Sequence, residues 1–215
     1  MKRKMIMLLT SISFLLLTVI PNVSAKEINY GDYIRVINND TQEEVAIKVT
    51  EITTETTPIE SSLSTFNASS DFTKEIQIKF DIPELNSINP LAYDDTSKNN
   101  GAFVAYLRYD YQKGGTTALP KIKVTSVRGS WKCTSTSYSA RFENREVLAR
   151  QGNWIYDDCS LNKKPGSNSF EYGTGWGFVS DLPKTEASGV YVMSTAKAII
   201  NGMGGGYTLE TKLSS

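Results

Sequence analysis

Apolar and polar residues alternate almost without a break through residues 101–111. One side of this segment carries Phe103, Ala105, Leu107, Tyr109 and Tyr111. The intervening positions include Arg108 and Asp110, which favour water. A period of two is that of an extended chain with one buried face. The segment is therefore predicted to be a half-buried β-strand, and this prediction constrains the fold of its neighbours.

Further strand-like segments follow one another along the chain with turn signals between them. They cover residues 33–37, 45–52, 75–82, 121–131, 138–150, 168–179, 190–200 and 207–213. A short helix is an alternative within residues 143–150 and 194–201. A phase slip near Ser126 and Val127 indicates a β-bulge. Short strands at regular spacing favour a sandwich or barrel, and we expect an antiparallel all-β sandwich of about six strands in residues 101–215.

Charge divides the chain into unequal parts. Residues 26–100 contain six Lys and Arg against fourteen Asp and Glu, whereas residues 101–215 contain fourteen against nine. The first part also carries a Ser/Thr-rich stretch and a second stretch rich in Asn, Asp and Ser. We therefore expect an acidic N-terminal arm with short strands and a linker at 26–100, followed by a β-sandwich domain at 101–215.

Residues 1–25 have the layout of a secretory signal peptide. Three basic residues at positions 2–4 precede an apolar run at 5–20, and Val23-Ser24-Ala25 supplies small residues for cleavage after Ala25. A membrane anchor is the alternative, but the uninterrupted apolar core at 13–20 is short for a span of about 20 residues. The expected product is secreted and extracellular, with no transmembrane segment after cleavage.

The chain has only two cysteines, Cys133 and Cys159. In an exported protein an even number of cysteines favours disulfide bonding. A Cys133–Cys159 disulfide is therefore expected, and it would stabilise the fold by roughly 3 kcal/mol in the chain-entropy model. Two free thiols are the alternative.

No histidine occurs anywhere in the chain. This absence removes catalysis by Ser-His-Asp or Cys-His and nearly all zinc sites. The polar loop at 94–101 lacks the glycine and glutamate of an EF-hand, so neither a metal nor a cofactor is expected. A polysaccharide-active enzyme would need two converging acids, and the candidates for that role are Asp110, Glu143, Glu146 and Glu171.

Residues 131–178 contain all three tryptophans and both cysteines. In the segment at 168–179 one parity carries four aromatic rings and the other carries glycines at 173, 175 and 177. Tyrosine and tryptophan rings stack on sugars and anchor interfaces when exposed, and fill β-sheet cores when buried. The candidate binding residues are Tyr172, Trp176, Trp154 and Tyr156.

A strand ending in Gly129-Ser130-Trp131, the aromatic run at 168–176 and a Gly-rich last hairpin are combined in residues 101–215. In these features the chain resembles small secreted all-β proteins of low-GC Gram-positive bacteria. The resemblance implies a fold and a compartment, and no activity.

The function expected from these observations is that of a secreted, non-catalytic protein that binds a cell-wall polymer or an extracellular protein. Nucleic acid is not expected as a partner, because the positive surplus of the second part is modest. One alternative is a bacteriocin-like or toxin-like effector with an acidic pro-segment. Another is the polysaccharide-active enzyme.

Overall fold

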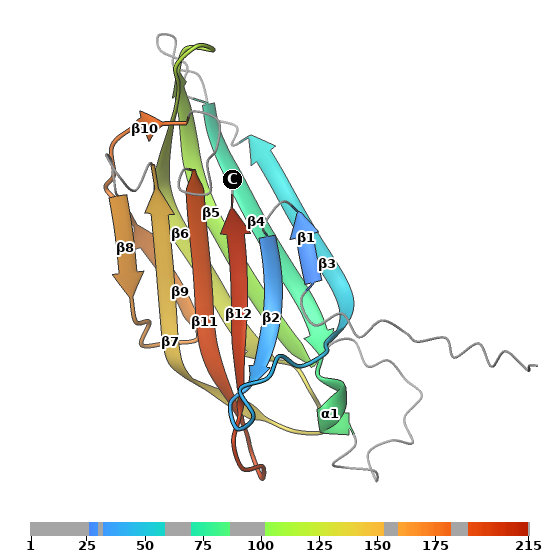
Figure 1. The fold of residues 1–215 in the computed structure, drawn as a ribbon. Coiled ribbons are helices and arrows are strands. Elements are labelled where there is room, and N and C mark those ends of the chain that lie inside the picture. The colour runs from blue at the N-terminus through green and yellow to red at the C-terminus, as the bar shows by residue number, and fades with distance from the viewer. Residues whose placement is uncertain are drawn as a thin grey trace, which may run out of the picture.

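The computed structural model describes residues 26–29, 32–58, 70–86, 102–152, 159–181 and 189–214. Two antiparallel sheets face one another as a sandwich (Figure 1). Sheet A contains, in spatial order, β1 (Lys26–Asn29), β2 (Asp32–Asn38), β12 (Tyr207–Ser214), β11 (Val190–Ile200), β7 (Ala140–Gln151) and β8 (Cys159–Lys163). Sheet B contains β10 (Val179–Ser180), β6 (Pro120–Cys133), β5 (Phe103–Gly115), β4 (Ser70–Asp81) and β3 (Lys48–Pro58), with β9 (Ser169–Gly173) also paired to β6. The all-β antiparallel prediction is confirmed, and α1 (Pro83–Asn86) adds a single helical turn to the described residues.

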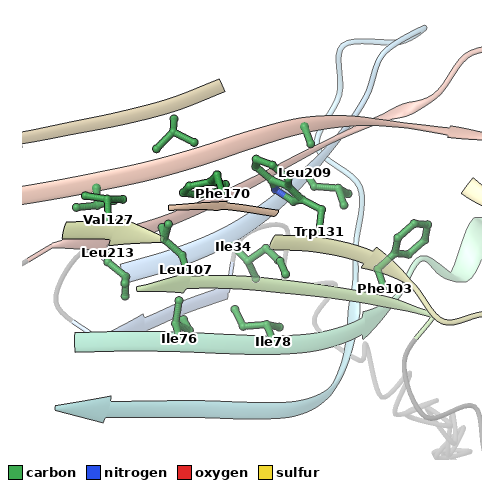
Figure 2. Packing of buried hydrophobic residues seen from close by; sticks show 14 of the residues in the cluster. Ile34, Ile76, Ile78, Phe103, Leu107, Val127, Trp131, Phe170, Leu209 and Leu213 are labelled. Carbon is green, nitrogen blue, oxygen red and sulfur yellow. The ribbon is translucent and has the colours of Figure 1, made fainter. Parts of the chain in front are cut away.

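Inward-facing residues of both sheets form one hydrophobic core. Ile34, Leu209 and Leu213 come from sheet A, and Figure 2 shows them among residues of sheet B such as Leu107 and Trp131. Because successive side chains point to opposite faces of a strand, the period of two in the sequence becomes a buried face and a polar face. The segment at 101–111 is a strand as predicted, and alternate residues of β5 from Phe103 to Tyr111 are buried. Asp110, which was expected to face water, is buried as well.

Two β-bulges explain the breaks in the alternation. In the pairing of β5 with β6, Asp110 lies opposite Ser126 and Tyr111 opposite Val124, so Thr125 is the extra residue. A second irregularity lies in β7, where Thr195 pairs with Glu146 and the pairing resumes at Glu143. Residues 140–151 and 190–200 are strands in the structure, so the helical alternatives for these segments are not realised.

Strands from residues 26–100 are built into both sheets. β2 lies between β1 and β12 in sheet A, and β4 pairs with β5 along its whole length in sheet B. Their inward residues are fully buried, as with Ile34, Ile76 and Ile78. The expected boundary at residue 100 is therefore crossed by both sheets. The Ser/Thr-rich stretch is partly strand, because β3 extends to Pro58 and β4 begins at Ser70.

The prediction of a Cys133–Cys159 disulfide is wrong, because both cysteines are free. Cys159 begins β8 opposite Gln151, whose side-chain oxygen accepts a hydrogen bond from the Val124 N–H at 2.6 Å. Val124 is nine positions before Cys133 on β6, which is roughly 30 Å of extended strand. A disulfide requires Cα atoms within about 7 Å of one another. The two thiols therefore lie near opposite ends of the sandwich.

Candidate binding surface

Two of the four predicted binding aromatics are placed by the structure, both at the β9–β10 edge of sheet B. The Tyr172 ring stacks on Phe170 with 5.8 Å between the ring centroids, and Phe170 is buried. Trp176 follows β9 and is half-buried against the core. Trp154 and Tyr156 lie outside the described residues. The rings of Tyr172 and Trp176 are thus partly occupied by packing and present only part of their area to a ligand.

The predicted aromatic strand at 168–179 is interrupted. β9 ends at Gly173, and pairing with β6 resumes only at Val179 in β10. A Cβ atom added to Gly173 or Gly177 would meet no atom within 4 Å, so these glycines face open space. Close approach occurs instead at Gly129, where an added Cβ would lie 2.6 Å from Cζ of Phe170. Gly129 therefore makes room for the ring that the aromatic segment buries.

A different set of aromatic rings lies on the outer face of sheet A. Tyr33 on β2 pairs directly with Lys212 on β12, and Tyr191 on β11 pairs with Ser214, two residues further along β12. The Lys212 ammonium lies 5.4 Å from the ring centroid of Tyr33 and 5.3 Å from that of Tyr191. Both separations are within cation–π range. We call these three residues the Tyr33–Lys212–Tyr191 cluster.

Glu210 holds one side of the cluster in place. Its carboxylate accepts a 2.5 Å hydrogen bond from the Tyr33 hydroxyl. Arg35 donates a 3.1 Å hydrogen bond from Nη2 to one carboxylate oxygen, and its Nε lies 2.8 Å from the other oxygen in an ion pair. Burial and the hydrogen bond to Glu210 raise the pKa of the Tyr33 hydroxyl well above its usual range. Tyr33 therefore remains a neutral donor at physiological pH, and a bidentate ion pair fixes the position of its acceptor.

Aliphatic and cationic side chains extend the cluster across the sheet. Met193 pairs with Lys212 on one side and with Leu148 on the other, and both apolar side chains are half-buried. Arg150 lies opposite Tyr191 and is exposed. Tyrosine, methionine and arginine are enriched where proteins bind partners, because they combine large contact area with polar groups. This outer face therefore has the composition of a recognition surface.

The outer face of sheet B carries a closed polar network around Asp110. The Asp110 carboxylate accepts hydrogen bonds from Ser126 at 2.6 Å and from Thr73 at 2.8 Å. Arg108 and Arg128 each lie 2.7 Å from it. Burial alone would raise the pKa of Asp110, but the hydrogen bonds from Ser126, Thr73 and Arg108 outweigh burial and lower it. An acid that is fully hydrogen-bonded and held ionised suits a structural role and not proton donation.

The four candidate acids for a polysaccharide-cleaving site are divided between the two sheets. Glu143 and Glu146 lie on β7 in sheet A, whereas Asp110 and Glu171 lie in sheet B, where both contact Arg128. A hydrogen bond from Arg141 lowers the pKa of Glu143. Within the described ranges no group of three or more metal-ligating side chains is found.

The fold and the surface define a class of protein: a two-sheet antiparallel β-sandwich with an aromatic and cationic outer face. No protein-family model, no curated protein and no solved structure matches the chain. In the part of the chain that the structure describes, no helix is long and apolar enough to cross a membrane.

Sequence reasoning did not find the Tyr33–Lys212–Tyr191 cluster. The alternation within 190–200 places Tyr191 on the polar side of its strand, and Tyr33 begins the predicted strand at 33–37. That signal identifies outward-facing rings but does not say which strands are neighbours. The pairing of β2 with β12 joins residues near opposite ends of the chain, and nothing local in the sequence specifies it.

Proposed function

We propose that this chain is a secreted, non-catalytic binding protein that attaches to an anionic polymer of the bacterial cell wall through the outer face of sheet A. The observation that carries the proposal is the Lys212 ammonium held between the rings of Tyr33 and Tyr191. Tyrosine rings stack on sugar rings, and an ammonium flanked by such rings can pair with a phosphate or carboxylate group of the same polymer.

Charge on this face supports an anionic ligand. Lys212 makes no ion pair with another described side chain, so its charge is available to a ligand. Arg150 is exposed one strand away from the cluster. Glu210 is buried, and its carboxylate is paired with Arg35 and hydrogen-bonded by Tyr33. The positive charge of Arg35 therefore offsets most of the repulsion between Glu210 and an anionic ligand. The N-terminal signal-like segment supports export to the compartment where such a polymer is found.

Cosedimentation with insoluble cell walls tests the proposal. Walls that retain teichoic acid should bind the protein, and walls stripped of it should bind it at least about tenfold more weakly, which corresponds to ~1.4 kcal/mol. Lys212→Gln and Tyr191→Ala should weaken binding by a similar factor, and added salt should weaken it further because exposed charges are screened.

Matched controls separate the cluster from the rest of the surface. Lys197→Gln removes a half-buried lysine from the same face of β11, opposite Thr208 on β12. Trp176→Ala removes a predicted binding ring at the other sheet. Both controls should retain wall binding. Equal retention of Lys212→Gln and wild type on teichoic-acid-containing walls would refute this site, provided that thermal unfolding shows all variants to be folded.

The effector alternative finds no support in the geometry. Release of an acidic pro-segment at 26–100 would remove β2 and β4, and with them buried residues of both sheets such as Ile34 and Ile78. Asp32 would be removed as well, and its carboxylate accepts a 2.6 Å hydrogen bond from the Ser214 N–H of β12.

A further inference from the structure

The β5–β6 hairpin and Phe178 form one end of the sandwich, which we call the apex. In Figure 1 the tip of this hairpin lies at the end of the molecule beyond the strands of sheet A. Phe178 belongs to the apex because a Cβ atom on Gly114 would lie 3.0 Å from its ring. Leu119 lies in the turn, where Thr116 and Leu119 exchange backbone hydrogen bonds of 3.0 and 3.2 Å. The apex is thus a tight, ordered turn with a phenylalanine ring against its base.

Exposed apolar area is concentrated at the apex. Among the described residues, the exposed large hydrophobic side chains are Leu119, at 62% exposure, and Phe178, at 42%. Elsewhere in the described part, large apolar residues are buried or half-buried. Apolar area exposed at one end of a molecule is a candidate interaction site.

Charge around the apex has a specific arrangement. Residues 114–120 contain no charged residue, and Lys113 and Lys121 bound this neutral tip on its two strands. Both lysines are exposed. A third lysine, Lys123, places its ammonium 5.4 Å from the centroid of the Phe178 ring. Among the described residues at this end, the carboxylates of Asp71 and Asp181 are half-buried, whereas Lys113 and Lys121 are exposed.

We propose that the apex docks on a membrane of anionic phospholipid, with Leu119 and Phe178 entering the interfacial region and the surrounding lysines contacting headgroup phosphates. A neutral apolar tip flanked by lysines fits a membrane surface in two ways. The long cationic side chains reach the headgroup phosphates, and the apolar tip is buried in the interfacial region below them. Juxtamembrane lysines are attracted by anionic lipid, and this attraction falls with added salt. The apex is separate from the Tyr33–Lys212–Tyr191 cluster and does not depend on it.

Vesicle cosedimentation tests this proposal on the form that begins at Lys26, which contains every described strand. Phosphatidylcholine vesicles that contain phosphatidylglycerol should bind the protein, and pure phosphatidylcholine vesicles should bind it at least about tenfold more weakly. Leu119→Ser should weaken partition into the mixed vesicles by about tenfold or more. Lys121→Glu should do the same, and high salt should reduce binding by wild type.

Lys163→Glu is the matched control, because Lys163 is an exposed lysine on β8, in sheet A and outside the apex. It should bind the mixed vesicles like wild type. Equal binding by Leu119→Ser and wild type, equal binding to both kinds of vesicle, or no binding by wild type would each overturn the proposal. Loss of wall binding by Lys212→Gln with vesicle binding retained would show that the two surfaces act separately.

Discussion

The side-chain amide of Gln151 takes the place of a neighbouring strand for Val124. Val124 lies on β6 where β9 has ended, and its N–H donates to Oε1 of Gln151 at 2.6 Å. The Val124 carbonyl accepts from the Thr174 hydroxyl at 2.6 Å. Gln151 in turn donates through Nε2 to the carbonyl of Gly177 at 2.7 Å. One buried side chain of sheet A thereby completes the hydrogen bonding of an interrupted edge in sheet B.

Replacement of this amide should be costly. Gln151→Leu keeps the approximate volume but leaves the Val124 N–H and the Gly177 carbonyl without this partner, and Gln151 is 1% exposed. An unsatisfied buried polar group costs about 1–3 kcal/mol, so we expect the free energy of unfolding to fall by about 2–4 kcal/mol in urea titrations. Gln112→Leu, at a half-buried site on β5, should change it by less than about 0.5 kcal/mol. Similar losses in both variants would contradict the role of Gln151.

Gly129 should not tolerate a side chain. A Cβ atom there would lie 2.6 Å from the Tyr106 carbonyl oxygen and 2.6 Å from Cζ of Phe170. Because one of these atoms is backbone, relief requires a shift of the β5–β6 pairing, and overpacking of this kind costs about 1–3 kcal/mol. Gly129→Ala should therefore lower the thermal midpoint in calorimetry.

Gly173→Ala is the control for Gly129. An added Cβ at Gly173 meets nothing within 4 Å, and its φ is not in the left-handed region. It should be neutral or stabilising by up to about 1 kcal/mol. If Gly173→Ala were as destabilising as Gly129→Ala, the proposed cause, close packing at Gly129, would be wrong.

Much of the secondary structure could be predicted from the chain, because burial of one face of a strand imposes a period of two. The strand at 101–111 and the bulge beside Ser126 follow from that period alone. Strand neighbours could not be predicted, because pairing is decided by contacts between segments far apart in sequence. The sequence therefore did not predict that Tyr33 and Lys212 are neighbours, although each lies on a predicted strand.

Two expectations about the site were wrong, the continuous aromatic strand and the disulfide. Both depended on how segments are placed in space, which a local sequence pattern does not specify. The aromatic parity at 168–179 predicted one strand, but β9 ends at Gly173 and pairing with β6 resumes only at Val179. The number of cysteines and the expected compartment predicted a disulfide between Cys133 and Cys159, but neither observation gives the distance between the two residues.

Both cysteines should react as free thiols. Purified protein that is denatured without reductant should react with two equivalents of a thiol reagent, because the strands hold Cys133 and Cys159 near opposite ends of the sandwich. The double variant Cys133→Ser with Cys159→Ser should then lose less than about 1 kcal/mol of stability, and not the roughly 3 kcal/mol of a lost disulfide. A monomer without reactive thiols and 2 Da lighter by mass spectrometry would contradict the arrangement of β6 and β8.

The Asp110 network should give the protein a pH-dependent component of stability. The folded pKa of Asp110 is lowered from its ordinary value, which is about 3.9 in an unfolded chain. A lowered folded pKa means that the unfolded state binds the proton more tightly, so this contribution is fully present above about pH 5. It is lost as the pH falls through 3.9 toward the folded pKa.

Asp110→Asn should remove this component while leaving the size of the side chain unchanged. At neutral pH the variant should be less stable by about 2 kcal/mol, because Arg108 and Arg128 lose a charged acceptor. The difference from wild type should shrink as the pH is lowered below about 4, since protonation removes the same charge from the native residue. Glu171→Gln is the control, because Glu171 is exposed and its contact with Arg128 is longer, at 3.5 Å. A difference between wild type and Asp110→Asn that stayed constant from neutral pH to pH 3 would show that charge at Asp110 does not stabilise the fold.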